Sequence, residues 1–165
     1  SSSSLFNLHT LFTPSAMRRR FLPMPANRLS IFVAEDDDLI RELVRTRLEL
    51  AGFHTRWADN GPEAMSQCNL VKPAALILDI NLPGLDGLSI LARWKERGVT
   101  PPPTLMLTAR HNAADVKEAI ALGAKDYLTK PFSDSILLSR VARLVRSVTP
   151  RSAPLPSPEH DDVFL

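Results

Sequence analysis

The stretch of sequence that decides the fold is Ala74-Ala75-Leu76-Ile77-Leu78-Asp79-Ile80-Asn81-Leu82-Pro83-Gly84-Leu85-Asp86-Gly87. A bounded apolar run of this length is typical of a strand that is buried on both faces of a parallel sheet. The Pro-Gly pair then predicts a turn. Asp79 would therefore lie at the carboxyl end of a central strand, where open α/β sheets bind their ligands. Taken alone, an aspartate in this place would be interpreted only as the start of the turn.

Hydrophobic periodicity elsewhere in the chain predicts strands that alternate with helices. The strands are expected at residues 29–34, 53–58, 74–79, 104–108 and 126–129. The helices are expected at residues 38–50, 62–69, 87–97, 113–122 and 133–147. This alternation indicates the α/β class, with a five-stranded parallel sheet and helices on both faces.

Length and composition suit one folded domain with a tail at each end. We expect residues 1–27, which are rich in Ser and Pro, to be disordered, and residues 28–148 to form the domain. Residues 149–165 are again rich in Pro and Ser and are interpreted as a linker or tail. The sequence pI of 9.0 reflects arginines in the N-terminal tail, so we expect a solvated basic arm and no direct nucleic-acid contact.

Cysteine usage and hydropathy indicate the compartment. The single Cys68 has no partner for an internal disulfide and no metal-ligand spacing, which favours a reducing, cytoplasmic location. No apolar run approaches the roughly 18 residues that are needed to cross a bilayer, so no membrane partner is expected.

Polar side chains follow four of the expected strands at the same edge of the sheet. Glu35 and Asp36 follow the first strand, Asp79 ends the third, Thr108 ends the fourth and Lys130 follows the fifth. Carboxylates that converge in this way repel one another unless a cation neutralises them, and oxygen ligands with open positions suit Mg²⁺. A lysine and a hydroxyl beside that cation would bind a phosphoryl group. The central carboxylate could then attack phosphorus and form an acyl phosphate.

Four motifs in this order resemble the response-regulator receiver domains of two-component signalling, over about residues 29–148. The motifs are Val33-Ala34-Glu35-Asp36, Leu78-Asp79-Ile80-Asn81-Leu82-Pro83-Gly84, Leu107-Thr108-Ala109 and Tyr127-Leu128-Thr129-Lys130-Pro131-Phe132. The resemblance implies the flavodoxin-like strand order 2-1-3-4-5.

The resemblance also implies a metal site and a phosphorylation site. Asp79 would accept the phosphoryl group from a sensor histidine kinase or a phosphotransfer protein. Mg²⁺ would be bound by Asp36, Asp79 and the backbone carbonyl of Asn81, with Glu35 acting through a water molecule. Asp37 lies outside this acidic pair, and we interpret it as an acid at a helix N-terminus.

The resemblance also implies that three further residues respond to phosphorylation and change the conformation of the domain. Lys130 would pair with the phosphoryl oxygens, and Thr108 would bind them by a hydrogen bond and move. Tyr127 would change rotamer in step with Thr108. The resemblance further implies a cis peptide bond between Lys130 and Pro131.

The output surface is expected on the face made by helix 113–122, strand 126–129 and helix 133–147. Of the charged residues that link dimers in the winged-helix branch of the family, Asp126 and Arg140 are present, whereas Val116 and Ile136 replace others. We therefore predict an apolar surface that includes Leu138 and binds a downstream protein or a second copy of the chain.

Three alternatives remain open at this point. The chain could be a pseudo-receiver that only binds partners, although all four site side chains are present. It could be an aspartyl-phosphate phosphatase, but these enzymes commonly place a second Asp where this sequence has Asn81. It could be the receiver part of a transcriptional regulator that contacts nucleic acid through a missing output domain. We favour a phospho-accepting signalling domain that catalyses only its own phosphorylation and dephosphorylation.

Overall fold

The computed structural model describes residues 28–109 and 113–147, so both expected tails and Val148, the last residue of the expected domain, lie outside these ranges. The described strands are β1 (Ser30–Ala34), β2 (His54–Ala58), β3 (Ala75–Asp79), β4 (Thr104–Thr108) and β5 (Asp126–Thr129). The described helices are α1 (Asp38–Leu50), α2 (Gly61–Val71), α3 (Gly87–Glu96), α4 (Ala113–Ala121) and α5 (Asp134–Arg146). Each element agrees with the sequence prediction to within two residues at either end.

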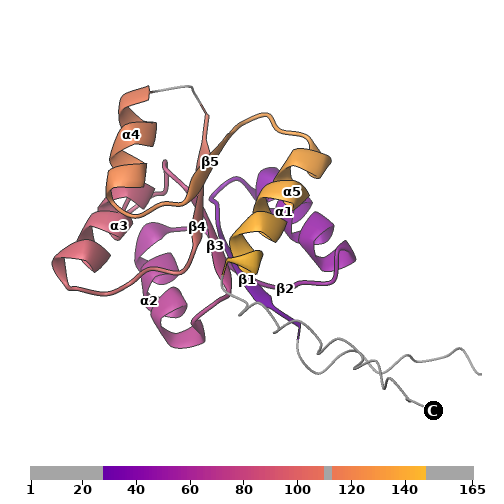
Figure 1. The fold of residues 1–165 in the computed structure, drawn as a ribbon, viewed down its shortest axis with the longest axis horizontal. Coiled ribbons are helices and arrows are strands. Elements are labelled where there is room, and N and C mark those ends of the chain that lie inside the picture. The colour runs from indigo at the N-terminus through magenta and orange to yellow at the C-terminus, as the bar shows by residue number, and fades with distance from the viewer. Residues whose placement is uncertain (1–27, 110–112, 148–165) are drawn as a thin grey trace, which may run out of the picture.

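All described strand pairs are parallel, and their order is β2-β1-β3-β4-β5, as the resemblance implied (Figure 1). Helices α1 and α5 cover one face of the sheet, and α2, α3 and α4 cover the other. None of the described helices has the length and apolar character that a membrane span requires.

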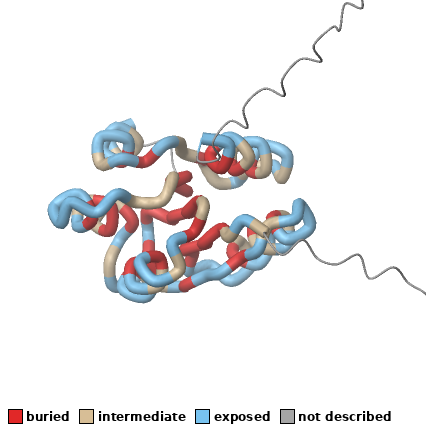
Figure 2. The backbone as a smooth tube through the Cα atoms, turned by 60° about the horizontal axis from the view of Figure 1, so that its bottom comes forward, coloured by how far each residue is buried: buried red, intermediate tan, exposed pale blue. Residues whose placement is uncertain are grey.

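Successive strand residues point to opposite faces, so the sheet divides the interior into two apolar clusters. Ile77 packs on the α1 and α5 side, whereas Leu76 and Leu78 pack on the α2 and α3 side. Every residue of β3 is buried, which is the pattern expected of a strand covered on both faces. Figure 2 shows the buried residues concentrated in the strands and on the inward sides of the helices.

Polar side chains cap the helices that follow the strands. The Asp37 carboxylate accepts hydrogen bonds from the backbone N–H groups of Leu39 at 2.9 Å and Ile40 at 3.0 Å. Asn60, Asp86 and Ser133 cap α2, α3 and α5 in the same way. Side-chain acceptors of this kind satisfy the free N–H groups of a first helical turn. The interpretation of Asp37 as a helix N-terminal acid is confirmed.

The burial of two residues in helix α1 differs from what their polarity predicts. Leu39 is 84% exposed, whereas Arg41 is buried. The Arg41 guanidinium donates to the Glu35 carbonyl oxygen at 2.9 Å and lies 4.3 Å from the centre of the Trp57 ring. These partners compensate the desolvation of the charge, which explains why an arginine takes a core position.

In α5 the side chain of Leu138 is half-buried against the cluster beneath α5, so only part of it is available to the predicted surface. Ile136, in contrast, remains exposed as expected. Leu138 follows the buried Leu137 closely enough around the helix to reach the same cluster.

Two glycines allow the loops beside the sheet edge to pack closely. A Cβ atom on Gly87 would lie 2.4 Å from the carbonyl oxygen of Asp79, and one on Gly61 would lie 1.8 Å from that of Leu85. The Gly87 N–H also donates to the Ile80 carbonyl oxygen at 2.8 Å. A larger residue at Gly87 would push the first turn of α3 away from the end of β3, and one at Gly61 would push α2 away from the loop that precedes α3.

Candidate functional site

The strand register brings the predicted site residues to one edge of the sheet. Ala34 of β1 lies opposite Leu78 of β3, Asp79 lies opposite Leu107, and Thr108 lies opposite Thr129. The residues that follow these pairs therefore leave the sheet together. Glu35, Asp79, Thr108 and Lys130 meet there because parallel strands end at a common edge.

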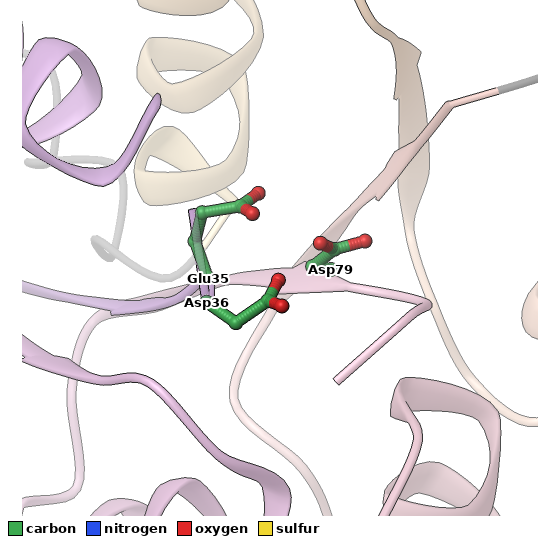
Figure 3. A group of neighbouring side chains, drawn as sticks. All are labelled: Glu35, Asp36 and Asp79. Atoms are coloured by element: carbon green, nitrogen blue, oxygen red, sulfur yellow. The ribbon is translucent and has the colours of Figure 1, made fainter. Parts of the chain in front are cut away.

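Three carboxylates form an acidic cluster at this edge. Glu35, Asp36 and Asp79 each offer one oxygen, and these oxygens lie within 4.8 Å of one another (Figure 3). Glu35 is 0% exposed and Asp79 is 3% exposed, whereas Asp36 is exposed. A set of oxygen ligands with one open side fits Mg²⁺, which binds few protein carboxylates and retains water molecules.

Lys130 joins the two buried carboxylates. Its Nζ atom lies 2.6 Å from Oε2 of Glu35 and 3.0 Å from Oδ2 of Asp79. The other oxygen of Asp79, Oδ1, accepts the backbone N–H of Asn81 at 3.0 Å. The cluster thus holds three acids and one lysine, so it retains an excess of negative charge that a divalent cation would neutralise.

This arrangement shifts the protonation of both Glu35 and Lys130. Burial, together with the charge of Asp79, raises the pKa of Glu35 to about 7, although Lys130 opposes the shift. Burial alone would lower the pKa of Lys130, but its ion pairs with Glu35 and Asp79 raise that pKa above its ordinary value. Lys130 therefore stays charged at neutral pH, whereas Glu35 changes its protonation near neutral pH.

The remaining predicted residues lie beside this centre. Thr108 is buried at the end of β4, and its carbonyl oxygen accepts the backbone N–H of Lys130 at 2.8 Å. The peptide bond between Lys130 and Pro131 is cis, which confirms that prediction. Tyr127 is half-buried on β5 and lines a groove between β5 and α4.

Sequence reasoning missed the contribution of Arg41 to the site. Its hydrogen bond to the Glu35 carbonyl holds the backbone from which two of the three carboxylates extend. An arginine in an amphipathic helix is normally assigned to the solvent face, so the pattern of α1 contained no signal for this role.

Comparison with known proteins shows the family to which this chain belongs. Residues 31–142 match the family model described as "Response regulator receiver domain", and the chain belongs to this family. The receiver domain of the Francisella response regulator 1452 has 31% sequence identity and a TM-score of 0.69, over 74% of this chain and all of that one. The chemotaxis protein CheY4 of Vibrio cholerae has 28% identity and a TM-score of 0.66, over 72% of this chain and 99% of that one.

Curated relatives include transcriptional regulators. The chain is 33% identical to the transcriptional regulatory protein CseB of Streptomyces avermitilis over 136 residues, which are 82% of this chain and 57% of CseB. It is 39% identical to TrcR of Mycobacterium tuberculosis over 72% of this chain and 46% of TrcR. The chain thus spans about half the length of the curated relatives it matches.

Proposed function

We propose that Asp79 is the phospho-acceptor of this receiver domain and that its donor is the phosphohistidine of a sensor kinase or a phosphotransfer protein. The observation that carries this proposal is the placement of Asp79 inside the acidic cluster, with the ammonium group of Lys130 at 3.0 Å. A carboxylate oxygen of Asp79 would form a bond to phosphorus as the phosphorus–nitrogen bond of the donor breaks. The leaving imidazole would take up a proton, so charge and atoms balance.

Residues of the acidic cluster would hold Mg²⁺ during this transfer. Asp36, Asp79 and the backbone carbonyl of Asn81 are the proposed ligands, and Glu35 would act through a water molecule. When bound, Mg²⁺ would neutralise the phosphoryl oxygens and orient them. The bound ion would also reduce the electrostatic repulsion among the three carboxylates of the cluster.

Lys130 and Thr108 are proposed to recognise the phosphoryl group once it is on Asp79. Oδ2 of Asp79 already attracts Lys130, so a phosphoryl oxygen placed near that atom would take over an existing ion pair. Thr108, at the end of the neighbouring strand, would donate its hydroxyl hydrogen to another phosphoryl oxygen. Tyr127, whose strand neighbour Met106 lies two residues before Thr108, would change rotamer in response. Hydrolysis of the acyl phosphate at the same site would reset the domain.

Incubation with acetyl phosphate tests this function directly. We expect the intact protein to gain the mass of one phosphoryl group when Mg²⁺ is present, and to gain none in excess EDTA. Restoring Mg²⁺ after EDTA should restore the labelling, which controls for damage by the chelator. Labelling that is equally fast in EDTA would contradict a metal-dependent acceptor.

We propose that the output surface is the face of α4, β5 and α5, and that its contacts are mainly apolar. A groove of about 700 Å³ between α4 and β5 is lined by Val116, Ile120 and Tyr127 among others. Ile120 and Ile136 are each 46% exposed on this face. Asp126 is already paired with Arg140 within the chain at 2.6 Å, so these charges have a partner without a dimer.

Ile120→Glu is expected to weaken the contact that follows activation. In the presence of beryllofluoride and Mg²⁺, we expect the wild-type chain to self-associate, or to bind its partner, at least tenfold more tightly than the variant. Loss of an apolar side chain at the centre of an interface typically has an effect of this size. Leu50→Glu is the matched control, because Leu50 is an exposed leucine at the end of α1. Sedimentation velocity measures self-association. A dimer that survives Ile120→Glu and is lost with Arg140→Ala would favour the charged interface instead.

The output itself is proposed to be transcriptional. Support comes from CseB, TrcR and QseB of Escherichia coli O157:H7, each a transcriptional regulatory protein of which this chain covers about half. In this proposal a nucleic acid is bound by a domain outside the present chain. The buried, free Cys68 is consistent with a cytoplasmic location.

A further inference from the structure

Helices α2 and α3 lie on the opposite side of the sheet from α1 and α5 (Figure 1). Residues of these two helices and of the loop before α3 line a second groove. Its volume is about 400 Å³. Arg93 of α3 and Arg97, the C-cap of that helix, lie one turn apart and form one wall, and both are exposed. Within residues 28–109 and 113–147 neither guanidinium forms an ion pair, although six other Arg and Lys side chains of the domain do. The groove therefore presents two cations without a described counter-charge.

Polarity changes along the groove. Arg97 and Asn69 lie near the C-terminal ends of α3 and α2, so they belong to the edge of the sheet where the strands begin. Pro62 and Leu85 lie near the helix N-termini, at the edge where the strands end. A ligand that fits both parts is an extended segment with acidic residues first and apolar residues after them.

The chain contains one such segment outside the described residues. Residues 159–165 read Glu-His-Asp-Asp-Val-Phe-Leu, with three acids followed by three apolar residues. Residues 1–27 contain no Asp or Glu, so charge excludes the other tail. We propose that residues 159–165 bind in the groove between α2 and α3, with their acids at Arg97 and Arg93 and their apolar residues toward Leu85 and Pro62.

The tether is long enough for this contact. Helix α5 runs antiparallel to the strands, so it ends at the same edge of the sheet as α2 and α3. Passing from the α5 layer to the α3 layer means crossing two layer spacings of about 10 Å each. Residues 148–158 are rich in Pro, and an extended chain of this kind spans about 3 Å per residue, or roughly 34 Å. The acidic residues would therefore be held near the groove at a high effective concentration.

A spin label on residue 160 of the full chain tests the proposal. The His160→Cys variant can be labelled selectively, because Cys68 is buried and burial raises the pKa of its thiol to about 12. We expect strong paramagnetic broadening of the amide signals of Ser66 and Arg93 at the groove. The amide of Ser139 on α5, on the other side of the sheet, should be broadened far less.

Charge variants decide whether the arginines hold the segment. Arg93→Glu should reduce occupancy about fivefold, which corresponds to the loss of one exposed ion pair. Lys95→Glu makes the same charge change on another side of α3 and should leave the broadening unchanged. Adding Asp161→Arg to Arg93→Glu should recover part of the contact.

Three results would overturn the proposal. The first is equal broadening of Ser66 and Ser139, and the second is broadening that Arg93→Glu leaves unchanged. The third comes from mixing isotope-labelled chain without a spin label with spin-labelled chain without isotope. Broadening that is as strong in this mixture would show binding between copies rather than within one chain.

Discussion

Asp79→Asn is expected to abolish phosphorylation by acetyl phosphate and by a phosphorylated kinase while leaving the protein folded. The amide oxygen of asparagine is a poor nucleophile for phosphorus, so the substitution removes the proposed acceptor and keeps a side chain of the same shape. The substitution also removes one of three clustered acids, so the free energy of unfolding should stay level or rise. Intact-protein mass measures the label, and thermal unfolding measures the fold.

Asp37→Asn is the matched control for this experiment. It makes the same chemical change beside the cluster, but Asp37 acts as the N-cap of α1 and asparagine caps a helix equally well. We expect its labelling to equal that of the wild-type chain. Label retained by a folded Asp79→Asn protein would assign the acceptor role to another residue, with Asp36 the first to be tested.

Much of the fold could be predicted from the sequence, because the strands of a parallel sheet are continuous apolar runs with sharp ends. Strand β3, which ends at Asp79, is buried at every position, and the turn residues Pro83 and Gly84 follow it as expected. The strand order could not be obtained in this way, since local periodicity does not say which strands are neighbours. It came from the resemblance, and the structure confirms it.

The composition of the site was predictable, but its contacts were not. The positions of Glu35, Asp79 and Lys130 at strand ends followed from the strand assignments alone. The direct ion pair between Lys130 and Glu35 depends on side-chain rotamers and on burial, which the sequence does not specify. The same is true of Arg41, whose burial requires a carbonyl acceptor and an aromatic ring from two other parts of the chain.

Of the substitutions proposed here, Lys130→Met is expected to lower the free energy of unfolding the most, and the size of this loss should depend on pH. Lys130 is the described cation that pairs with both Glu35 and Asp79, and removing one partner of a buried ion pair costs about 3 kcal/mol. Protonation of Glu35 would remove part of this cost, because burial already raises the pKa of Glu35 from its ordinary value of 4.5 to about 7. A group whose pKa is raised on folding stabilises the protein fully below its unfolded pKa, and this contribution is lost as the pH rises through its folded pKa.

The loss of stability in Lys130→Met should therefore be small near pH 5 and close to its full value near pH 8. Urea unfolding at both pH values, without Mg²⁺, measures the difference. Lys95→Met is the control, since Lys95 is exposed on α3 and its removal should change stability by less than about 0.5 kcal/mol at either pH. Adding Glu35→Gln to Lys130→Met should recover most of the loss at pH 8, because the glutamine carries no charge. Equal losses at pH 5 and pH 8 would show that the lysine stabilises the site by packing, and the electrostatic account of the cluster would then be wrong.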